Sequence, residues 1–256
     1  MKSFESLFAR LDDLRECAVR GNVGISAFFS PKESFVACEY LTHGKVDFFS
    51  YGGYTDAERK KIYILPDFIE EKSVDALFDF GFSCEIDCLS VDGSGFERLS
   101  HRAVMGSILG LGIERDAVGD IVMINDNSAI FFCDSKLSEF FCENLDRVGK
   151  DKVKVKRIEL DESILPERKV QMINDTVASA RLDCVVAALC SLSRERAKER
   201  IVSSFVELNY ECEERADREI GVPAIISVRG VGKFRVISLS DKTKKGRYRL
   251  VAEKFL

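Results

Sequence analysis

The sequence predicts an α+β protein made of several small domains. Helical and strand periodicities alternate along the whole chain, and a tract with the order strand-helix-strand-strand-helix-strand occupies its middle. At 256 residues and 46% hydrophobic, the chain is long enough for two or three domains that each bury a core. We expect an N-terminal α/β domain at residues 1–72, a central domain at 73–160, a linker at 161–176 and a C-terminal domain at 177–256.

The N-terminal residues predict two helices followed by two strands. Apolar residues recur at helical spacing between Phe4 and Leu14. A second helix begins after Ser30, which we expect to cap it together with Glu33 in a capping box, with proline at the first helical position. The stretch "KVDFFSYGGYTDAERKKIYILPD" then predicts two strands around a glycine turn at Gly52-Gly53.

The central residues predict a ferredoxin-like (RRM-like) split βαβ domain. A strand around "CEIDCLSV" precedes a helix over residues 100–111, and "IVMIND" with "SAIFFCD" predicts an antiparallel pair. Ser135 is expected to cap a helix with Phe140, Phe141 and Leu145 on its apolar face, and "KVKVKRIEL" alternates as the last strand. This order is that of the split βαβ fold, which hosts RNA readers and many unrelated proteins.

The C-terminal residues predict a helix pair backed by a small β-sheet. Leu182, Val185, Val186 and Leu189 repeat at helical spacing, and Ser193 is expected to cap a second helix. The segments "FVELN", "IISVRG", "KFRVISL" and "RYRLVAEKF" predict short strands.

The charge of the chain is divided unevenly between its parts. Residues 177–256 hold 16 lysines and arginines against 11 aspartates and glutamates, although the formal net charge of the whole chain is -5. A basic C-terminal third on an acidic body predicts a polyanionic partner at one end. Nine scattered cysteines and no apolar run near ~18 residues predict a cytoplasmic protein with reduced thiols and no membrane span.

The segment "SRERAKERIV" carries the densest basic pattern. Arg194 and Lys198, and likewise Arg196 and Arg200, lie four residues apart and share a helix face. The interleaved glutamates are able to neutralise them, so a salt-bridged solvated surface is the alternative to a phosphate-binding face.

The C-terminal pattern resembles the S-four RNA-binding domain, named after a ribosomal protein of the small subunit. The matching segments are "RLD", "SRERAKERI", "VELN" and "ISVRGVGKF". The resemblance implies that the helices and the following loop form a positive surface for structured RNA. The residues that match its characteristic sites are Arg181, Ser193, Arg194, Lys198 and Asn209. Asp183 matches too, and we expect it to be a buried charge partner or a helix cap.

Two departures from the S-four pattern affect its loops. Ser204 replaces the usual glycine before the "VELN" strand, and Pro223-Ala224 replaces the usual Gly-Asp turn. A missing turn glycine indicates an altered local backbone, while the helix face is intact.

Further basic residues extend the candidate RNA surface. Arginines bind phosphates bidentately and lysines act as mobile point charges, so the surface would read the shape of an RNA duplex. The additional candidates are Arg200, Arg229, Lys233, Arg235, Lys242, Lys244, Lys245 and Arg247. For the last four, a solvated hairpin is the alternative.

Most of the chain resembles the YlmH-type bacterial proteins. "FFSYGGYTDAERKKIYILPDF" and "LSHRAVMGSILGLGIERDAVGDIVM" are similar to their N-terminal and central signatures. The resemblance implies a non-enzymatic cytoplasmic RNA-binding protein that acts at the ribosome. We expect a monomer when free that binds rRNA of the large ribosomal subunit. In some members the subunit is obstructed by peptidyl-tRNA during ribosome-associated quality control. An RNA-modifying enzyme or a ribosome-assembly adaptor with the same RNA-binding domain is the alternative.

Two more basic groups are candidates for secondary RNA contacts. Arg59, Lys60 and Lys61 form one cluster, and His101 with Arg102 begins the helix of the central domain. A solvated surface is the alternative for both groups.

No catalytic, metal or cofactor site is expected. The chain has two histidines, and neither lies near a cysteine at zinc spacing. The glycines of "GSILGLG" fit neither a P-loop nor a dinucleotide fingerprint, and "VDGSGFERL" leads into no helix with an acidic ribose partner. Cys84 and Cys88 are expected to be buried, as are Phe131 and Phe132, of which only one can lie on each face of the sheet.

Overall fold

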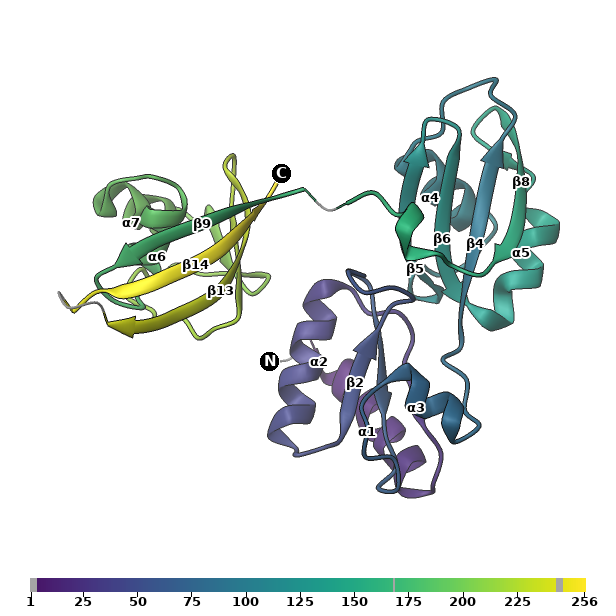
Figure 1. Ribbon diagram of the computed structural model, residues 1–256, viewed down its shortest axis with the longest axis horizontal. Helices are drawn as coiled ribbons and strands as arrows, with labels where there is room; N and C mark the ends of the chain where they lie inside the picture. Colours follow the sequence, from purple (N-terminus) through teal and green to yellow (C-terminus); the bar gives the residue numbers. More distant parts are fainter. Residues whose placement is uncertain (1–3, 168, 243–245) are drawn as a thin grey trace. The chain divides into compact units, whose positions relative to one another are not determined.

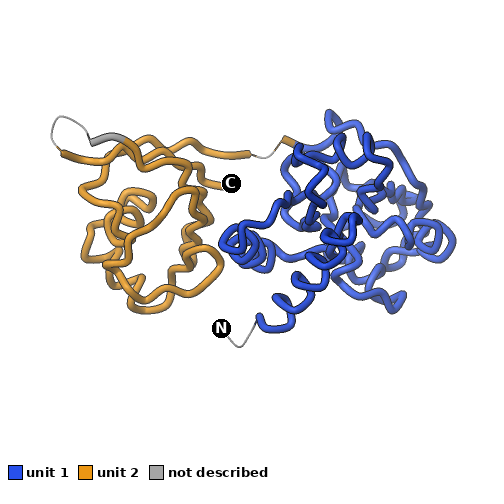
Figure 2. The backbone as a smooth tube through the Cα atoms, turned by 90° about the horizontal axis from the view of Figure 1, so that it is seen from below, with its two compact units in different colours: residues 1–166 blue, residues 167–256 orange. Residues whose placement is uncertain are grey.

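The computed structural model describes residues 4–167, 169–242 and 246–256. The chain divides into two compact units, residues 1–166 and 167–256 (Figure 2). The first unit holds a three-stranded and a five-stranded sheet, and the second holds a six-stranded sheet. The mixed α+β class predicted from the sequence is confirmed.

The N-terminal part of the first unit packs helices against a three-stranded sheet of order β1-β3-β2 (Figure 1). Its elements are α1 (Glu5–Val19), β1 (Gly24–Ile25), α2 (Pro31–His43), β2 (Phe48–Tyr51), β3 (Lys61–Ile64) and α3 (Val74–Asp79). The predicted capping box starts α2, since Ser30 Oγ accepts from the Glu33 N–H and the Glu33 carboxylate accepts from the Ser30 N–H over 2.8 Å. The residues of α3 fall inside the range 73–160 expected for the central domain, where no helix was predicted before the first strand. Ala76 and Leu77 of α3 instead share a core with Tyr63 of β3.

The central part of the first unit has the predicted split βαβ order. Its elements are β4 (Ile86–Gly93), α4 (His101–Gly110), η2 (Arg115–Ala117), β5 (Val118–Asn125), β6 (Ser128–Asp134), η3 (Ser135–Leu137), α5 (Ser138–Asn144), β7 (Arg147–Val148), β8 (Asp151–Ile158) and η4 (Glu162–Ile164). The sheet order is β5-β6-β4-β8-β7 with antiparallel neighbours. Strand β6 therefore lies between β4 and β5, which α4 connects, as the ferredoxin-like fold requires.

The capping expected at Ser135 is wrong. Asp134 accepts from the Lys136 N–H over 3.1 Å and opens the short 3-10 turn η3, so Ser135 is already inside a helical turn. Phe141 and Leu145 are buried as expected, whereas Phe140 is 36% exposed.

The two phenylalanines of β6 lie on opposite faces of the sheet, and both are buried as expected. Phe131 meets Phe141 edge to face at 5.2 Å on the helix side. Phe132 stacks on Tyr54 at 5.1 Å on the other side, in a cluster that includes Phe28. The N-terminal part thus covers the aromatic ring that an RRM-like sheet would otherwise present to a nucleobase.

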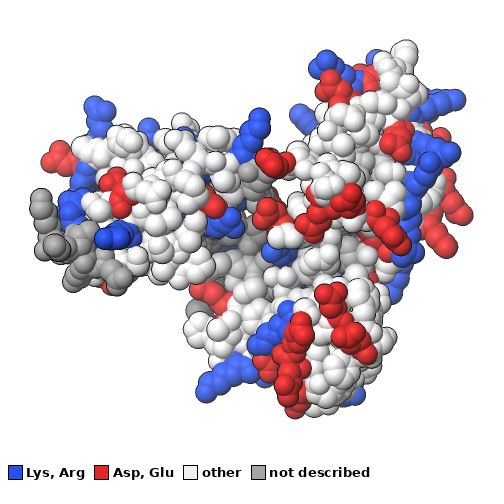
Figure 3. Space-filling model, viewed as in Figure 1, with Lys and Arg blue, Asp and Glu red and all other residues white. Residues whose placement is uncertain are grey.

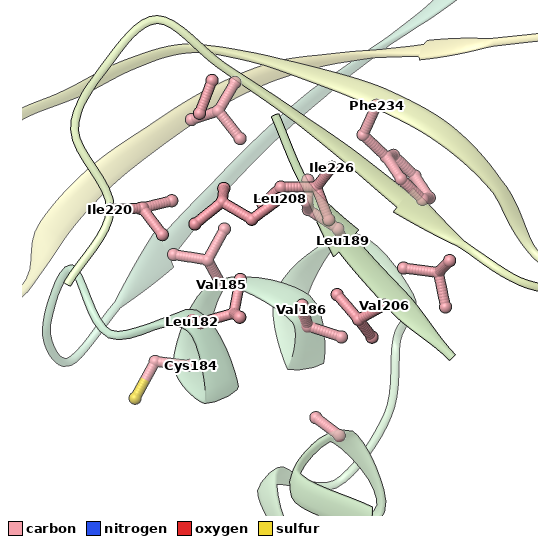
Figure 4. Packing of buried hydrophobic residues seen from close by; sticks show 14 of the residues in the cluster. Leu182, Cys184, Val185, Val186, Leu189, Val206, Leu208, Ile220, Ile226 and Phe234 are labelled. Atoms are coloured by element: carbon pink, nitrogen blue, oxygen red, sulfur yellow. The ribbon is translucent and has the colours of Figure 1, made fainter. Parts of the chain in front are cut away.

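The second unit packs a helix pair on one face of an antiparallel sheet. Its elements are β9 (Val170–Val177), α6 (Leu182–Leu189), α7 (Arg194–Val202), β10 (Val206–Leu208), β11 (Glu211–Cys212), β12 (Ala224–Val228), β13 (Gly232–Lys242) and β14 (Tyr248–Phe255). The sheet order is β11-β10-β12-β13-β14-β9. Figure 4 shows Val185 and Leu189 of α6 directed at the apolar side chains of the sheet, among them Leu208, Ile226 and Phe234.

Strand β9 corrects the expected linker at residues 161–176. Val170 pairs with Phe255 and Val177 with Tyr248, so the strand lies along the full length of β14. Residues 170–176 of the expected linker are therefore part of the edge strand of the second unit.

Candidate nucleic-acid interface

A buried carboxylate organises the helix pair of the second unit. Asp183 is 2% exposed, and its oxygens accept from the guanidinium of Arg181 over 3.1 and 3.2 Å and from Arg194 Nε over 2.9 Å. The Cys184 N–H donates to the same carboxylate over 2.9 Å. Burial alone would raise the pKa of Asp183, but the hydrogen bonds from the two arginines outweigh it and lower the pKa. Asp183 is thus the buried charge partner that the sequence predicts.

The two arginines bound to Asp183 still reach the surface. The side chain of Arg181 is 38% exposed and that of Arg194 is 57% exposed. Arg194 uses its Nε to bind Asp183, and its side chain remains more than half exposed. A guanidinium held in this way loses little conformational entropy when it binds a phosphate.

Two exposed basic side chains on opposite flanks of α7 have no acidic partner in the described part of the chain. Ser193 caps the helix, accepting from the Arg196 N–H over 3.3 Å, so its hydroxyl has a structural role. Arg196 and Lys198 are exposed, and among the described residues their side chains form neither an ion pair nor a hydrogen bond. Within the described ranges, the salt-bridged alternative for this helix is therefore not realised.

A basic and aromatic group adjoins the end of α7. Arg200 donates to the Arg229 carbonyl over 3.1 Å. The guanidinium of Arg229 lies 5.2 Å from the centre of the Phe205 ring, which is 39% exposed. Phe205 was not among the residues predicted to bind RNA. Its signal is the alternation around Val206, because an apolar residue directly before a strand and out of phase with its buried positions points away from the core.

Asn209 forms hydrogen bonds with the backbone of Ile225. Its Oδ1 accepts from the Ile225 N–H over 2.9 Å, and its own N–H donates to the Ile225 carbonyl over 2.8 Å. Its φ is 51°, a left-handed conformation that asparagine tolerates better than most residues. The asparagine that matches the S-four pattern thus shapes the turn after β10.

The basic residues of β13 lie on the other face of the sheet. Phe234 and Val236 point into the core beneath the helices, so Lys233 and Arg235 point away from them. Arg235 pairs with Glu253 over 2.6 Å. The predicted RNA surface is therefore split, and the structure does not bring these two residues to the outer face of α7.

The predicted basic tail is only partly described. Lys242 ends β13, and Lys244 and Lys245 lie outside the described residues. Arg247 donates to the Thr176 hydroxyl over 3.0 Å and to its carbonyl over 2.6 Å. This contact ties the hairpin to β9.

The cluster at residues 59–61 corrects a prediction. Lys61 is 1% exposed, and its ammonium donates to Asp134 and to the Glu85 carbonyl, each over 2.9 Å. Burial would raise the pKa of Asp134, but this bond outweighs it and lowers the pKa. Lys61 is thus a core residue that joins the two parts of the first unit, and its prediction as an RNA contact or a solvated lysine is wrong.

The neighbours of Lys61 differ from it in exposure. Arg59 is half-buried and commits its guanidinium to three backbone carbonyls, so it too is structural. These acceptors are the carbonyls of Val118, Phe28 and Arg115, at 2.8 to 3.1 Å. Lys60 is half-buried.

Two exposed basic groups remain on the first unit. His101 and Arg102 are exposed at the start of α4. Lys152, Lys154 and Lys156 are exposed at alternate positions of β8, on the sheet face opposite the buried Val155. The lysine alternation in "KVKVK" is the signal for this stripe, which sequence analysis used only to predict a strand.

The charges of the first unit are mixed. Figure 3 shows Asp and Glu side chains gathered over this unit, together with lysines and arginines. Among the described residues, no group of three or more histidines, cysteines or acids has a metal-binding arrangement. No helix in the described ranges is long and apolar enough to cross a bilayer.

The central part of the first unit is similar to a known protein family. Residues 84–162 match the family model described as "Putative RNA-binding domain in YlmH". The central domain is similar to the RNA-binding domain of YlmH. This stretch contains the strands β4 to β8 and the lysine stripe of β8.

Two further relatives are similar over more of the chain. "Ribosome-associated protein quality control protein P2" of Bacillus subtilis (strain 168) is 26% identical over 231 residues, which is 90% of this chain and 86% of the relative. "Cell division protein ylmH from Streptococcus pneumoniae" is a solved structure with 17% identity and a TM-score of 0.49, covering 59% of this chain and 86% of its own.

Proposed function

We propose that the chain is a non-enzymatic RNA-binding protein whose C-terminal unit is an S-four-type domain that holds structured RNA. The observation that carries the proposal is the set of exposed basic side chains on α7. Arg196 and Lys198 are exposed on opposite flanks of the helix without acidic partners among the described residues, and Asp183 holds Arg194, which lies one turn before Lys198. Charges fixed on a rigid helix suit the phosphates of an RNA duplex, whose deep groove hides the base edges.

The RNA is, in this proposal, rRNA of the large ribosomal subunit, with peptidyl-tRNA as a neighbour, during quality control of stalled translation. The name of the Bacillus relative supports the ribosomal setting, and the match to the family model supports RNA binding by the central domain. The exposed lysine stripe of β8 gives that domain a phosphate-binding surface of its own.

The test is co-sedimentation with large ribosomal subunits across a salt series. The variant Arg196→Ala/Lys198→Ala removes two charges whose side chains have no structural contact within the described chain. The matched control Arg15→Ala/Arg20→Ala removes two exposed charges, one from α1 and one from its C-cap, where each pairs with an acid three or four residues away. Both variants change the net charge equally.

We expect the wild type and the control to co-sediment with the large subunit. The α7 variant should leave the subunit at lower salt, and the slope of log affinity against log salt should fall by about one unit for each lost phosphate contact. Equal sedimentation of all three proteins would show that α7 does not contact RNA. Wild-type protein that stays at the top of the gradient at low salt, with empty and with peptidyl-tRNA-obstructed subunits, would contradict ribosome binding.

A further inference from the structure

Phe205 and Arg229 line two shallow hollows at the surface of the second unit. One hollow, of about 420 Å³, is lined by this pair with Glu199, Arg200 and Ser203. The other hollow, of about 370 Å³, is lined by the pair together with Glu207 and residues of the strands β10 and β12 and of the turn after β12.

The fold of the second unit does not need the exposed Phe205 side chain for its core. Val206 and Leu208 supply the buried contacts of β10, and Phe205 points away from them. Its ring is 39% exposed, and Arg229 lies over it at 5.2 Å. The backbone fixes both residues, because the Arg229 N–H donates to the Phe205 carbonyl over 2.9 Å and the Phe205 N–H donates to the Arg200 carbonyl over 3.0 Å.

We infer that Phe205 and Arg229 form a platform on which one unpaired nucleobase of the bound RNA stacks. This inference deepens the proposed function and rests on it. A base within a duplex has both faces covered by its neighbours, so only an unpaired base can use an aromatic ring at the surface. Arg200 and Arg229 offer cations for the phosphates on either side of that base.

The charges at the platform favour a nucleotide over an apolar protein segment. An exposed aromatic side chain with the Arg229 guanidinium over its ring, and with Arg200 nearby, suits a ligand that is both planar and anionic. Glu199 and Glu207 line the two hollows and can accept hydrogen bonds from amino groups of a base. Recognition by this unit would then combine duplex shape, read by α7, with one base outside the duplex.

The experiment measures binding of the full chain to large ribosomal subunits, together with chemical probing of the rRNA bases by dimethyl sulfate and carbodiimide. The variants are Phe205→Ala and Phe205→Tyr. Ile237→Ala is the matched control, because Ile237 is an apolar residue of the same unit with 41% exposure. Thermal unfolding checks that each variant is folded.

The expected result is that Phe205→Ala weakens binding about 5- to 100-fold and leaves the salt slope unchanged, because a stacked base and no phosphate contact is lost. The wild type and Phe205→Tyr should protect an unpaired rRNA base that Phe205→Ala leaves reactive. Unchanged affinity of Phe205→Ala overturns the inference. If Phe205→Ala binds more weakly but protects the same bases as the wild type, the inference is also overturned. The Phe205 ring would then contact a ribosomal protein. If the wild type itself binds no large subunit, the proposed function is wrong.

Discussion

The Nε–H of Arg194 donates a hydrogen bond to Oδ2 of Asp183 over 2.9 Å, so an arginine expected to bind RNA also holds the helix pair together. Its neighbour Lys198, one turn further along α7, has no side-chain partner among the described residues. The two residues share a helix face but should respond differently to substitution.

Arg194→Ala should lower the free energy of unfolding of the second unit by about 1–3 kcal/mol, because the buried Asp183 loses one of its charged donors. Lys198→Ala should leave that free energy within about 0.5 kcal/mol, as is usual for an exposed residue. Urea unfolding followed by circular dichroism measures both. Equal stability of the two variants would contradict a structural role for the Arg194–Asp183 pair.

Asp183→Asn tests the titration of the buried carboxylate. The folded-state pKa of Asp183 is lowered, so its stabilising contribution is present above the unfolded-state pKa of about 3.9 and is lost as the pH falls through the folded-state value. The wild type should therefore lose stability more steeply than the variant below about pH 4. Urea midpoints between pH 2.5 and 6 report this difference. Parallel curves of urea midpoint against pH would show that other carboxylates dominate the pH dependence of stability.

Lys61→Met should destabilise the first unit by about 3 kcal/mol, because it leaves Asp134 without its buried partner. Lys60→Met is the control, since it changes a half-buried neighbour on the same segment and should cost much less. Thermal unfolding of both variants gives the comparison. A loss of RNA affinity in Lys61→Met that occurs without a loss of stability would restore Lys61 as a surface contact.

Asn209 allows the hydrogen bond and the backbone conformation to be separated. Asn209→Gly keeps a residue that tolerates φ 51° and loses only the bond to the Ile225 N–H, at a cost of about 1 kcal/mol. Asn209→Ala should cost about 1 kcal/mol more, because alanine adopts the left-handed region unfavourably. Chemical denaturation measures both, and the salt slope of RNA binding should not change. A lower slope would indicate a phosphate contact through this residue.

The features that the sequence predicted well are set by neighbours in the chain. The Ser30–Glu33 capping box and the Ser193 cap depend on residues three apart, and both are present. Strand alternation placed Phe131 and Phe132 on opposite faces for the same reason.

The features that it missed depend on distant residues or on exposed strands. Lys61 is buried because Asp134, 73 positions further on, lies beside it. Charge alone made the segment at 59–61 resemble a solvated surface. Strand β9 is largely exposed and polar, so its pairing with β14 leaves no apolar alternation to detect.

The pairing of β9 with β14 decides where the second unit can be cut for expression. A fragment that begins at Val177 would leave the whole of β14 as an open strand edge. Its free N–H and C=O groups would then recruit strands from other molecules and promote aggregation. A fragment that begins upstream of Val170 keeps β14 paired and is the piece to use for studies of RNA binding in isolation.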